Sequence, residues 1–521
     1  MSILKNAFVV GSFTALSRVL GLVREMLQSR LIGAGVAQSA FTLAFALPNM
    51  ARKLFGEGAL TAAFVPVFKA EAETEGLEKA ARLARAVMTT VLLSLAAAVA
   101  LSIAGLCSAQ AMAERFAFSE RTRLTLSLVT ILAPYMLAIC GAAFGMGVLN
   151  SLGKFKASSL MPSLLNVVWI AALAILSFFP GIAVENRIRL VAGAILAGGF
   201  LQMAFMFVAM ARRGVSPRPK FSGWFEPKVR LVWRNLATGA AGAGAIQLNY
   251  MLDQFLAQAA SPWAAGVIGY SERLMDLPLG VVGVAFGTVL LPSLSGLFAR
   301  NDIEGARDAV SSSLVRLLFL MLPAAAGLAV LAPETAGAIY EGGEFDSLAT
   351  LRVSRALAVY AVGLGLFGLQ KILVPWFQAQ RDMKTPLKTT LATVAANAVL
   401  NIAAVVLLPV EWRHVGLAAS TVLCAGAGCA MLYAAATRKN GSLGLARAAG
   451  PVARIAAASI AMGAVLAAAK WAIASSPAAS GALPPGSVAR LAALVAAGGA
   501  VYAACAAAFM RDLLPRRRSV R

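Results

Sequence analysis

Residues 84–111 have the sequence ARAVMTTVLLSLAAAVALSIAGLCSAQA, in which Arg85 is the only charged side chain. A helix crosses the hydrocarbon core of a bilayer with about 20 predominantly apolar residues, so this stretch is long enough to span a membrane. Its apolar residues are continuous, whereas the strands of a membrane barrel alternate in polarity over about 10 residues. The stretch therefore predicts a transmembrane helix and an all-α fold.

The same character extends over the whole chain of 521 residues, of which 60% are hydrophobic and 13% are charged. Soluble domains carry about 25% charged residues, so a water-soluble enzyme is excluded. Apolar runs bounded by charges or by Pro and Gly predict a polytopic membrane protein with 14 transmembrane helices. Their approximate bounds are 4–32, 38–68, 84–111, 123–150, 157–179, 189–211, 231–260, 263–298, 309–332, 351–378, 386–409, 414–436, 449–473 and 488–510.

The net charge of +23 would favour nucleic-acid binding in a soluble protein. In a membrane protein, Lys and Arg instead gather in the cytoplasmic connections. Basic residues fill alternate connections here, with an excess of about three to one on the side that holds both ends of the chain. We therefore expect both termini to be cytoplasmic and expect no nucleic-acid partner. The basic connections are 69–85, 154–156, 212–234, 381–388, 438–454 and the tail 511–521.

A weak internal repeat accompanies these runs. FVPVFKAEAE resembles LLPSLSGLFA, with Pro66 and Pro292 separated by 226 positions, and a second pair of similar connections places Lys156 and Lys384 228 positions apart. Transporters are often built from related halves. We predict two pseudo-symmetric six-helix lobes, residues 1–220 and 221–440, followed by two extra helices and a basic tail over 441–521.

Charged residues inside the apolar runs are concentrated in the first two helices of each predicted repeat. An ionised side chain in hydrocarbon costs at least about 2.5–3.5 kcal/mol, so such residues indicate function by default. We expect the four helices to face a water-filled central cavity between the lobes. The charged residues are Arg18, Arg24, Glu25, Arg52, Glu57, Asp253, Glu272, Arg273 and Asp276.

The excess of arginine predicts an anionic ligand, because guanidinium groups offer forked donors that match phosphate oxygens. We predict that Arg18, Arg24, Arg52 and Arg273 bind a diphosphate. The alternative is that the arginines only form ion pairs. The acidic charge partners are Glu25, Glu57, Glu272 and Asp276, with Asp253 as a further partner of Arg24 in the ion-pair alternative.

A possible monovalent-cation site combines Asp253 with Asn397, Asn401 and Thr421. The two asparagines are spaced i,i+4 and share one helix face, and oxygen ligands suit a hard cation such as Na⁺. The alternative is that the asparagines only hydrogen-bond a neighbouring helix. No other cofactor is predicted. An enzyme is not favoured, because the chain lacks a nucleotide-binding loop and its acidic clusters fall in connections.

Several motifs in order along the chain resemble the MurJ (MviN) family of lipid II flippases of bacterial peptidoglycan synthesis. They are SRVLGLVRE at 17–25, GAGVAQSAFTLAFALPNMARKLFGEGALTAAFVPVF at 33–68, YSERLMDLPLGVVGVAFGTVLLPSLS at 270–295, RDMKTP at 381–386 and HVGLAAS at 414–420.

The resemblance implies the multidrug/oligosaccharidyl-lipid/polysaccharide exporter fold. It also implies alternating access that carries undecaprenyl-pyrophosphate-linked lipid II from the cytoplasmic to the periplasmic leaflet, for cell-wall biogenesis and cell shape. The family's important arginines fall on Arg18, Arg24, Arg52 and Arg273, and its acidic position in the second helix falls on Glu57. Where some members have an aspartate in that helix, this chain has Ser39. A sodium site of some members maps loosely onto the asparagine set, since Asn401 replaces an acid.

The resemblance further implies a functional monomer in the bacterial inner membrane, driven by membrane potential or a cation. Membrane lipids and cell-wall synthesis proteins are its expected partners. The alternatives are an exporter of drugs or of another polyprenyl-linked glycan, and a non-transporting scaffold for cell-wall enzymes. A drug exporter that handles cations would have an acidic cavity, and a scaffold would tolerate loss of the arginines.

Overall fold

The computed structural model describes residues 2–53, 59–116, 118–224, 226–444, 446–476, 484, 486–510, 512 and 513. Within these residues the regular elements are all helical, and an isolated bridge between Gly342 and Phe345 is the only β-type pairing. A helix satisfies its own backbone hydrogen bonds, which the bilayer interior requires. The predicted all-α class is confirmed.

Ten helices in the described part of the chain are long and apolar enough to cross a membrane. They correspond to predicted runs three to six and nine to fourteen, the runs that are nearly uncharged at their centres. The chain is therefore a multi-pass membrane protein. The ten are Leu77–Met112, Glu120–Ser151, Phe155–Ser177, Val184–Ala211, Ile303–Val330, Ser347–Ala379, Lys384–Leu407, Val410–Asn440, Arg447–Ser475 and Val488–Phe509.

Contacts divide the chain into two compact units. The first unit comprises residues 1–258 together with 342–345, and the second comprises 259–341 and 346–521. A division by contacts differs from a division by sequence repeat, so the predicted lobe boundary at residue 220 stays a prediction.

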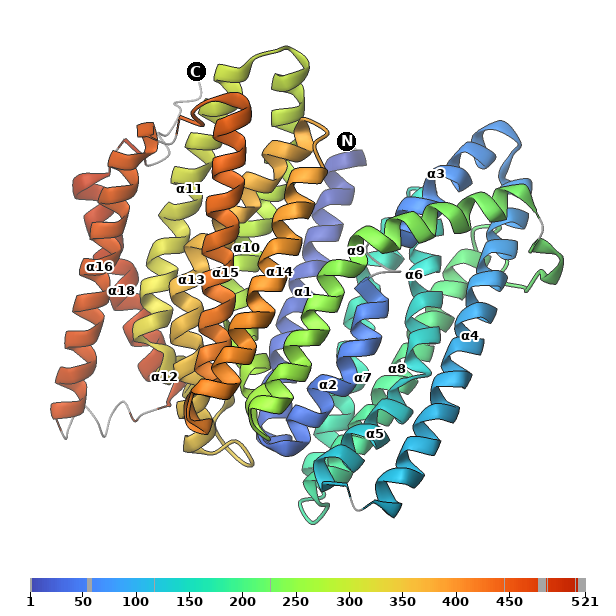
Figure 1. Ribbon diagram of the computed structural model, residues 1–521, viewed down its shortest axis with the longest axis horizontal. Coiled ribbons are helices and arrows are strands. Elements are labelled where there is room, and N and C mark those ends of the chain that lie inside the picture. The colour runs from blue at the N-terminus through green and yellow to red at the C-terminus, as the bar shows by residue number, and fades with distance from the viewer. Residues whose placement is uncertain are drawn as a thin grey trace. The chain divides into compact units, whose positions relative to one another are not determined.

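The first unit contains nine α-helices and one short 3₁₀ helix among its described residues (Figure 1). Its most extensive helix pairings are α1 with α7 and α6 with α8. The helices are α1 (Ser2–Ile32), α2 (Val36–Ala51), α3 (Ala59–Thr74), α4 (Leu77–Arg115), α5 (Glu120–Leu132), α6 (Tyr135–Ser151), α7 (Phe155–Ser177), α8 (Val184–Ala211), η2 (Phe221–Gly223) and α9 (Pro227–Ala260), whose last two residues fall in the second unit.

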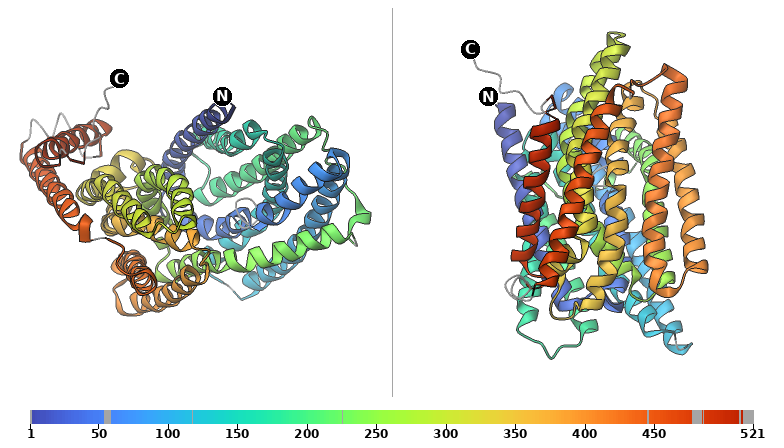
Figure 2. Two further views of the ribbon diagram at one scale, coloured as in Figure 1. Left: turned by 90° about the horizontal axis from the view of Figure 1, so that it is seen from above. Right: turned by 90° about the vertical axis from the view of Figure 1, so that its left-hand side faces the viewer.

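The second unit is built around α13, which packs against α10, α11 and α15. The red helices α16 and α18 pair with each other, and α16 packs along α11 (Figure 2). The helices are α10 (Ala264–Ala299), α11 (Ile303–Val330), α12 (Ala332–Tyr340), α13 (Ser347–Ala379), α14 (Lys384–Leu407), α15 (Val410–Asn440), α16 (Ala446–Ser475) and α18 (Val488–Phe509).

Two predicted runs are each divided between two helices. The run 38–68 becomes α2 and α3, with residues 54–58 outside the described residues. The run 123–150 becomes α5 and α6, which meet at Pro134. Proline lacks the N–H that would continue the hydrogen bonding of α5, so the helix is interrupted there.

A loop from late in the chain belongs to the first unit. The Glu344 N–H donates to Arg30 O at 2.9 Å, and Glu344 Oε1 accepts from Arg187 Nη1 at 3.1 Å. Gly343 has φ of +59°, and a Cβ there would lie 2.3 Å from Arg30 O. Only glycine fits this approach and this backbone conformation.

The connection between α13 and α14 carries Asp382 outside the candidate spans. Its carboxylate accepts from the Thr385 N–H at 3.1 Å and from Lys439 Nζ at 3.0 Å. The backbone hydrogen bond from Thr385, and then the one from Lys439, hold the pKa of Asp382 at about 2, below its ordinary value of 3.8. The carboxylate thereby fixes the start of α14 and ties it to the end of α15.

Candidate functional site

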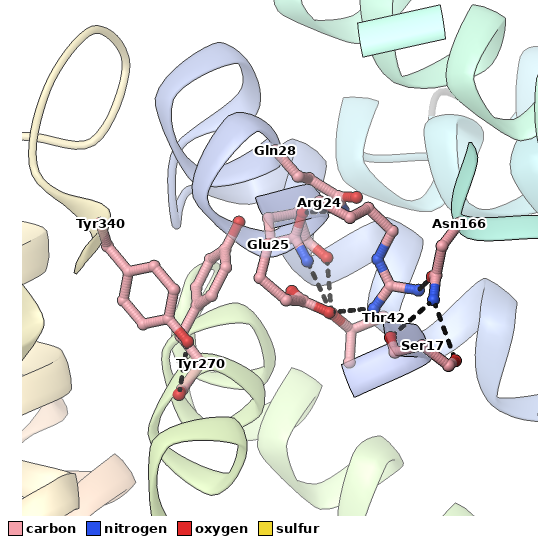
Figure 3. Close-up of polar contacts among 9 residues, drawn as sticks. Ser17, Arg24, Glu25, Gln28, Thr42, Asn166, Tyr270 and Tyr340 are labelled. Carbon is pink, nitrogen blue, oxygen red and sulfur yellow. Dashed lines mark hydrogen bonds and ion pairs between the residues drawn. The ribbon is translucent and has the colours of Figure 1, made fainter. Parts of the chain in front are cut away.

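Arg24 lies on α1 and is largely enclosed, with 15% of its side chain exposed. Nη2 forms an ion pair with Glu25, and Nη1 donates to Asn166 Oδ1 at 3.0 Å (Figure 3). The guanidinium carbon also lies 4.3 Å from the ring centre of Trp169. The pairing with Glu25 is one of the two expected for Arg24, and it leaves the guanidinium held from three sides.

Asn166 is a site residue that the sequence did not indicate. It is buried on α7, accepts from Arg24 through Oδ1, and donates from Nδ2 to Ser17 O at 3.1 Å. Figure 3 shows it between Arg24 and Ser17. Asn166 therefore joins α1 to α7 and aims the guanidinium at the same time.

Aromatic side chains support the Arg24 guanidinium. Trp169 contacts Phe41 and Phe45 edge-to-face, with ring centres 5.7 Å apart in both pairs. Phe45 in turn contacts Tyr135 at 6.0 Å. A cation over an indole face is attracted by the ring quadrupole, so this cluster stabilises the position of the charge.

Arg52 follows the last residue of α2, and its Nε donates to Asn49 Oδ1 at 3.2 Å. Arg24 Nε and the Tyr135 hydroxyl are buried and form no hydrogen bond to any described residue. Both are donors that an anion could use.

The other predicted residues of this unit are less informative. Arg18 lies on α1 and is exposed. Glu57 lies outside the described residues, so its predicted pairing with Arg52 stays a prediction. Ser39 on α2 is fully buried, and its carbonyl accepts from Gln258 Nε2 at 2.5 Å.

Arg273 belongs to the second unit, on α10, and its side chain is exposed. Asp276 on the same helix is exposed as well, and Glu272 is half-buried and accepts from the Tyr360 hydroxyl at 3.4 Å. Nearby, the Tyr340 hydroxyl donates to Tyr270 O at 3.3 Å (Figure 3). The structure thus places Arg24 and Arg52 in one unit and Arg273 in the other.

The residues predicted to bind a cation are likewise split between the two units. Asn401 Nδ2 donates to Asn397 Oδ1 at 2.8 Å within α14, which confirms that the two share a face. Thr421 on α15 donates to Leu417 O at 3.1 Å. Asp253, in the first unit, accepts from Asn249 at 3.2 Å. No cluster of three or more His, Cys, Asp or Glu that could hold a metal occurs among the residues the structure describes.

A family model described as "Lipid II flippase MurJ" matches residues 28–483. The chain belongs to this family. A "Probable lipid II flippase MurJ" of Rhizobium tropici is 35% identical over 406 residues, 77% of this chain and 75% of that protein. A "Lipid II flippase MurJ" of Burkholderia cenocepacia is 30% identical over 428 residues, 81% of each chain. The resemblance found in the motifs is confirmed.

Solved structures show the fold of this family member. "Lipid II flippase MurJ, inward closed conformation" aligns with a TM-score of 0.77 at 22% identity, over 98% of this chain and 100% of that one. An inward-facing multidrug resistance MATE family transporter of the MOP superfamily aligns at 0.63 and 14% identity, over 86% and 98%. The relatives are named as flippases, which are transporters. The sequence likewise predicted a transporter and not an enzyme.

The family match starts at residue 28. Arg52 and Arg273 lie within the matched region, whereas Arg18 and Arg24 precede it. The case for Arg24 therefore rests on its surroundings in the structure, and above all on the hydrogen bond from Asn166 and the stacking on Trp169.

Proposed function

We propose that this protein carries lipid II from the cytoplasmic to the periplasmic leaflet of the bacterial inner membrane. The observation that supports it most strongly is the family match over residues 28–483. The MATE transporters with related folds have been solved both inward-facing and outward-facing. We infer from this a mechanism of alternating access, in which the cavity opens to one side of the membrane at a time.

We propose that Arg18, Arg24, Arg52 and Arg273 bind the diphosphate of the lipid. Arg24 is the best supported of the four. Its ion pair with Glu25 keeps the charge stable in an apolar surrounding, because an unpaired buried charge is costly. Phosphate oxygens then compete with the Glu25 carboxylate for the guanidinium, while Asn166 and Trp169 hold it in place. A ligand that binds one conformation of the protein more tightly than the other shifts the equilibrium toward that conformation.

The proposal includes the finer membrane arrangement. Fourteen helices cross the bilayer as two six-helix lobes plus two extra helices, around a central cavity, with both termini cytoplasmic. The supporting observation is that the charges inside the predicted runs are concentrated in the four runs other than the ten apolar spans, although Arg316 and Lys371 lie within those spans. The protein works as a monomer, with membrane lipids and cell-wall synthesis proteins as partners.

Membrane potential or a monovalent cation resets the carrier in this scheme, since moving one charge through 100 mV is worth about 2.3 kcal/mol. For a sodium ion the fit is partial, because Asn397 Oδ1 already accepts from Asn401. Flipping would be measured in sodium and in choline buffers for wild type and Asp253→Asn. Loss of sodium stimulation only in the variant would support the site, and equal stimulation of both would refute it.

The central test is complementation of a flippase-depleted bacterium by wild type, Arg24→Ala and Arg273→Ala at matched expression, with the leaflet of lipid II assayed in the same cells. Arg82→Ala is the control, because Arg82 forms an exposed ion pair with Glu78 on α4. We expect wild type and the control to restore outward lipid II and the two cavity variants to fail.

The other outcomes separate the alternatives. Growth restored equally by both cavity variants would show that the arginines are structural and would favour a scaffold for cell-wall enzymes. Lipid II that stays inside even with wild type would indicate another polyprenyl-linked glycan or a drug as the substrate.

A further inference from the structure

A polar cavity of about 530 Å³ lies in the first unit where α4 ends and where α5 and α8 begin. Its volume falls within the range of about 300–1,000 Å³ that is typical of small-molecule sites. None of its lining residues belongs to the Arg24 site. The lining residues are Gln110, Glu120, Arg123, Leu124, Ser127, Glu185, Asn186 and Arg189.

Helices α5 and α8 each supply one acid and one base in their first two turns. Glu120 and Arg123 are three residues apart on α5, and Glu185 and Arg189 are four apart on α8. Side chains at these spacings are neighbours on a helix and commonly pair. Among the residues that the structure describes, none of these four side chains forms an ion pair within 4.0 Å. The cavity thus holds two positive and two negative groups that form no ion pair with one another, and Arg189 Nη1 donates to the neutral Asn186 Oδ1 at 2.7 Å.

This charge pattern fits a ligand that carries both charges. A simple anion would be attracted by Arg123 and Arg189 but repelled by the two glutamates. A simple cation would be attracted by the glutamates but repelled by the two arginines. A zwitterion satisfies both sets. Gln110 and Ser127 add neutral polar groups to the cavity lining.

The surroundings of the cavity indicate that this ligand is a lipid. Phe116 and Phe118, which precede α5, are 62% and 43% exposed, and Phe178 and Phe179, which precede α8, are 80% and 54% exposed. The candidate spans Glu120–Ser151 and Val184–Ala211 begin at these points. The end of a membrane span lies near the headgroup region of the bilayer, and an exposed phenylalanine there offers apolar surface to acyl chains. The cavity therefore lies where two candidate spans begin, and exposed apolar side chains stand within a few residues of it in the sequence.

We propose that this cavity binds the headgroup of a zwitterionic phospholipid of the phosphoethanolamine type. Arg123 and Arg189 hold the phosphate through their forked N–H donors, and Glu120 and Glu185 accept hydrogen bonds from the ammonium group. The four phenylalanines contact the glycerol and the upper acyl chains. The site does not depend on the proposed flipping of lipid II.

The test uses the delipidated full-length chain, titrated with phosphatidylethanolamine or phosphatidylglycerol of identical acyl chains and analysed by native mass spectrometry. We expect wild type to prefer phosphatidylethanolamine. Glu120→Gln with Glu185→Gln should abolish that preference, and Arg123→Gln with Arg189→Gln should weaken binding of both lipids about tenfold, which corresponds to about 1.4 kcal/mol. The matched control is Glu78→Gln with Arg82→Gln, an exposed acid and base on α4 that should leave binding unchanged.

Size-exclusion profiles identical to wild type would establish that the variants are folded. Equal binding of both lipids by wild type would overturn the proposal, and so would a preference that survives the double glutamate substitution. Soluble glycerophosphoethanolamine and a zwitterionic dipeptide serve as competitors. Displacement of the lipid by the former supports headgroup recognition, whereas displacement by the dipeptide alone would assign the cavity to a peptide and refute the lipid assignment.

Discussion

Replacing Asn166 by leucine tests how the Arg24 guanidinium is positioned. Leucine is close to asparagine in size and removes both polar groups of a buried side chain. The change breaks the bond from Arg24 Nη1 at 3.0 Å and the bond to Ser17 O at 3.1 Å. Glu25 and Trp169 still contact Arg24, so its charge stays partly compensated while its direction is released.

The magnitude follows from these two bonds. A hydrogen bond to a charged group contributes about 1.5–3 kcal/mol net, and one between membrane helices averages about 0.6 kcal/mol. Because Arg24 keeps its ion pair, we expect the free energy of unfolding to fall by about 2 kcal/mol. Loss of orientation should lower the rate of lipid II flipping about tenfold, which corresponds to about 1.4 kcal/mol.

Unfolding would be followed in detergent on the purified full chain, and flipping in the depleted strain described above. Ser159→Ala is the matched control, because Ser159 is half-buried on the same helix and its hydroxyl donates to Phe155 O within that helix. Wild-type stability together with wild-type flipping in the Asn166 variant would refute the reasoning. Reduced stability with normal flipping would show that Asn166 only joins α1 to α7 and does not position Arg24.

Three further predictions concern the rest of the chain. Gly343→Ala should lower the free energy of unfolding by about 1–2 kcal/mol, because its Cβ would meet Arg30 O at 2.3 Å and its φ is positive; an unchanged melting temperature would contradict this. Arg187→Gln should destabilise the protein more than Glu344→Gln, since the arginine is buried and the Glu344 side chain is 43% exposed; the opposite order in thermal unfolding would count against a structural role for Arg187. The low pKa of Asp382 stabilises the fold above about pH 4, and this contribution is lost as the pH falls toward about 2; unfolding measured from pH 5 to 2.5 should show it in wild type and not in Asp382→Asn, and equal slopes would exclude it.

The membrane-spanning helices could be predicted because their apolar runs are long enough to cross a bilayer. Runs such as 84–111 leave no alternative to a spanning helix, because nothing else satisfies the backbone in a bilayer. Among the described residues, the structure contains ten helices that are long and apolar enough to be such spans. An ion-pair partner for Arg24 could be anticipated for a related reason, since a charge inside an apolar run needs a partner or a ligand, and the structure shows Glu25 as that partner. Diphosphate binding by Arg24 stays a prediction.

Other features depend on contacts between residues far apart in the chain. Asn166 looks like any polar residue in a membrane helix until α7 is seen to pack on α1. The interruption at Pro134 was hidden because the run around it is uniformly apolar. A four-residue loop such as 342–345 carries too few residues to indicate that it belongs with the first unit.

The membership of that loop has a consequence for dissecting the protein. The chain leaves the first unit after Gln258, returns at Gly342 and leaves again after Phe345. A cut in the connection between α8 and α9 would therefore give an N-terminal fragment that lacks both α9 and the loop. The C-terminal fragment would carry the whole second unit together with α9 and the loop of the first unit. The first unit would be divided between the two fragments, so it would form only if both were produced together and reassembled by fragment complementation.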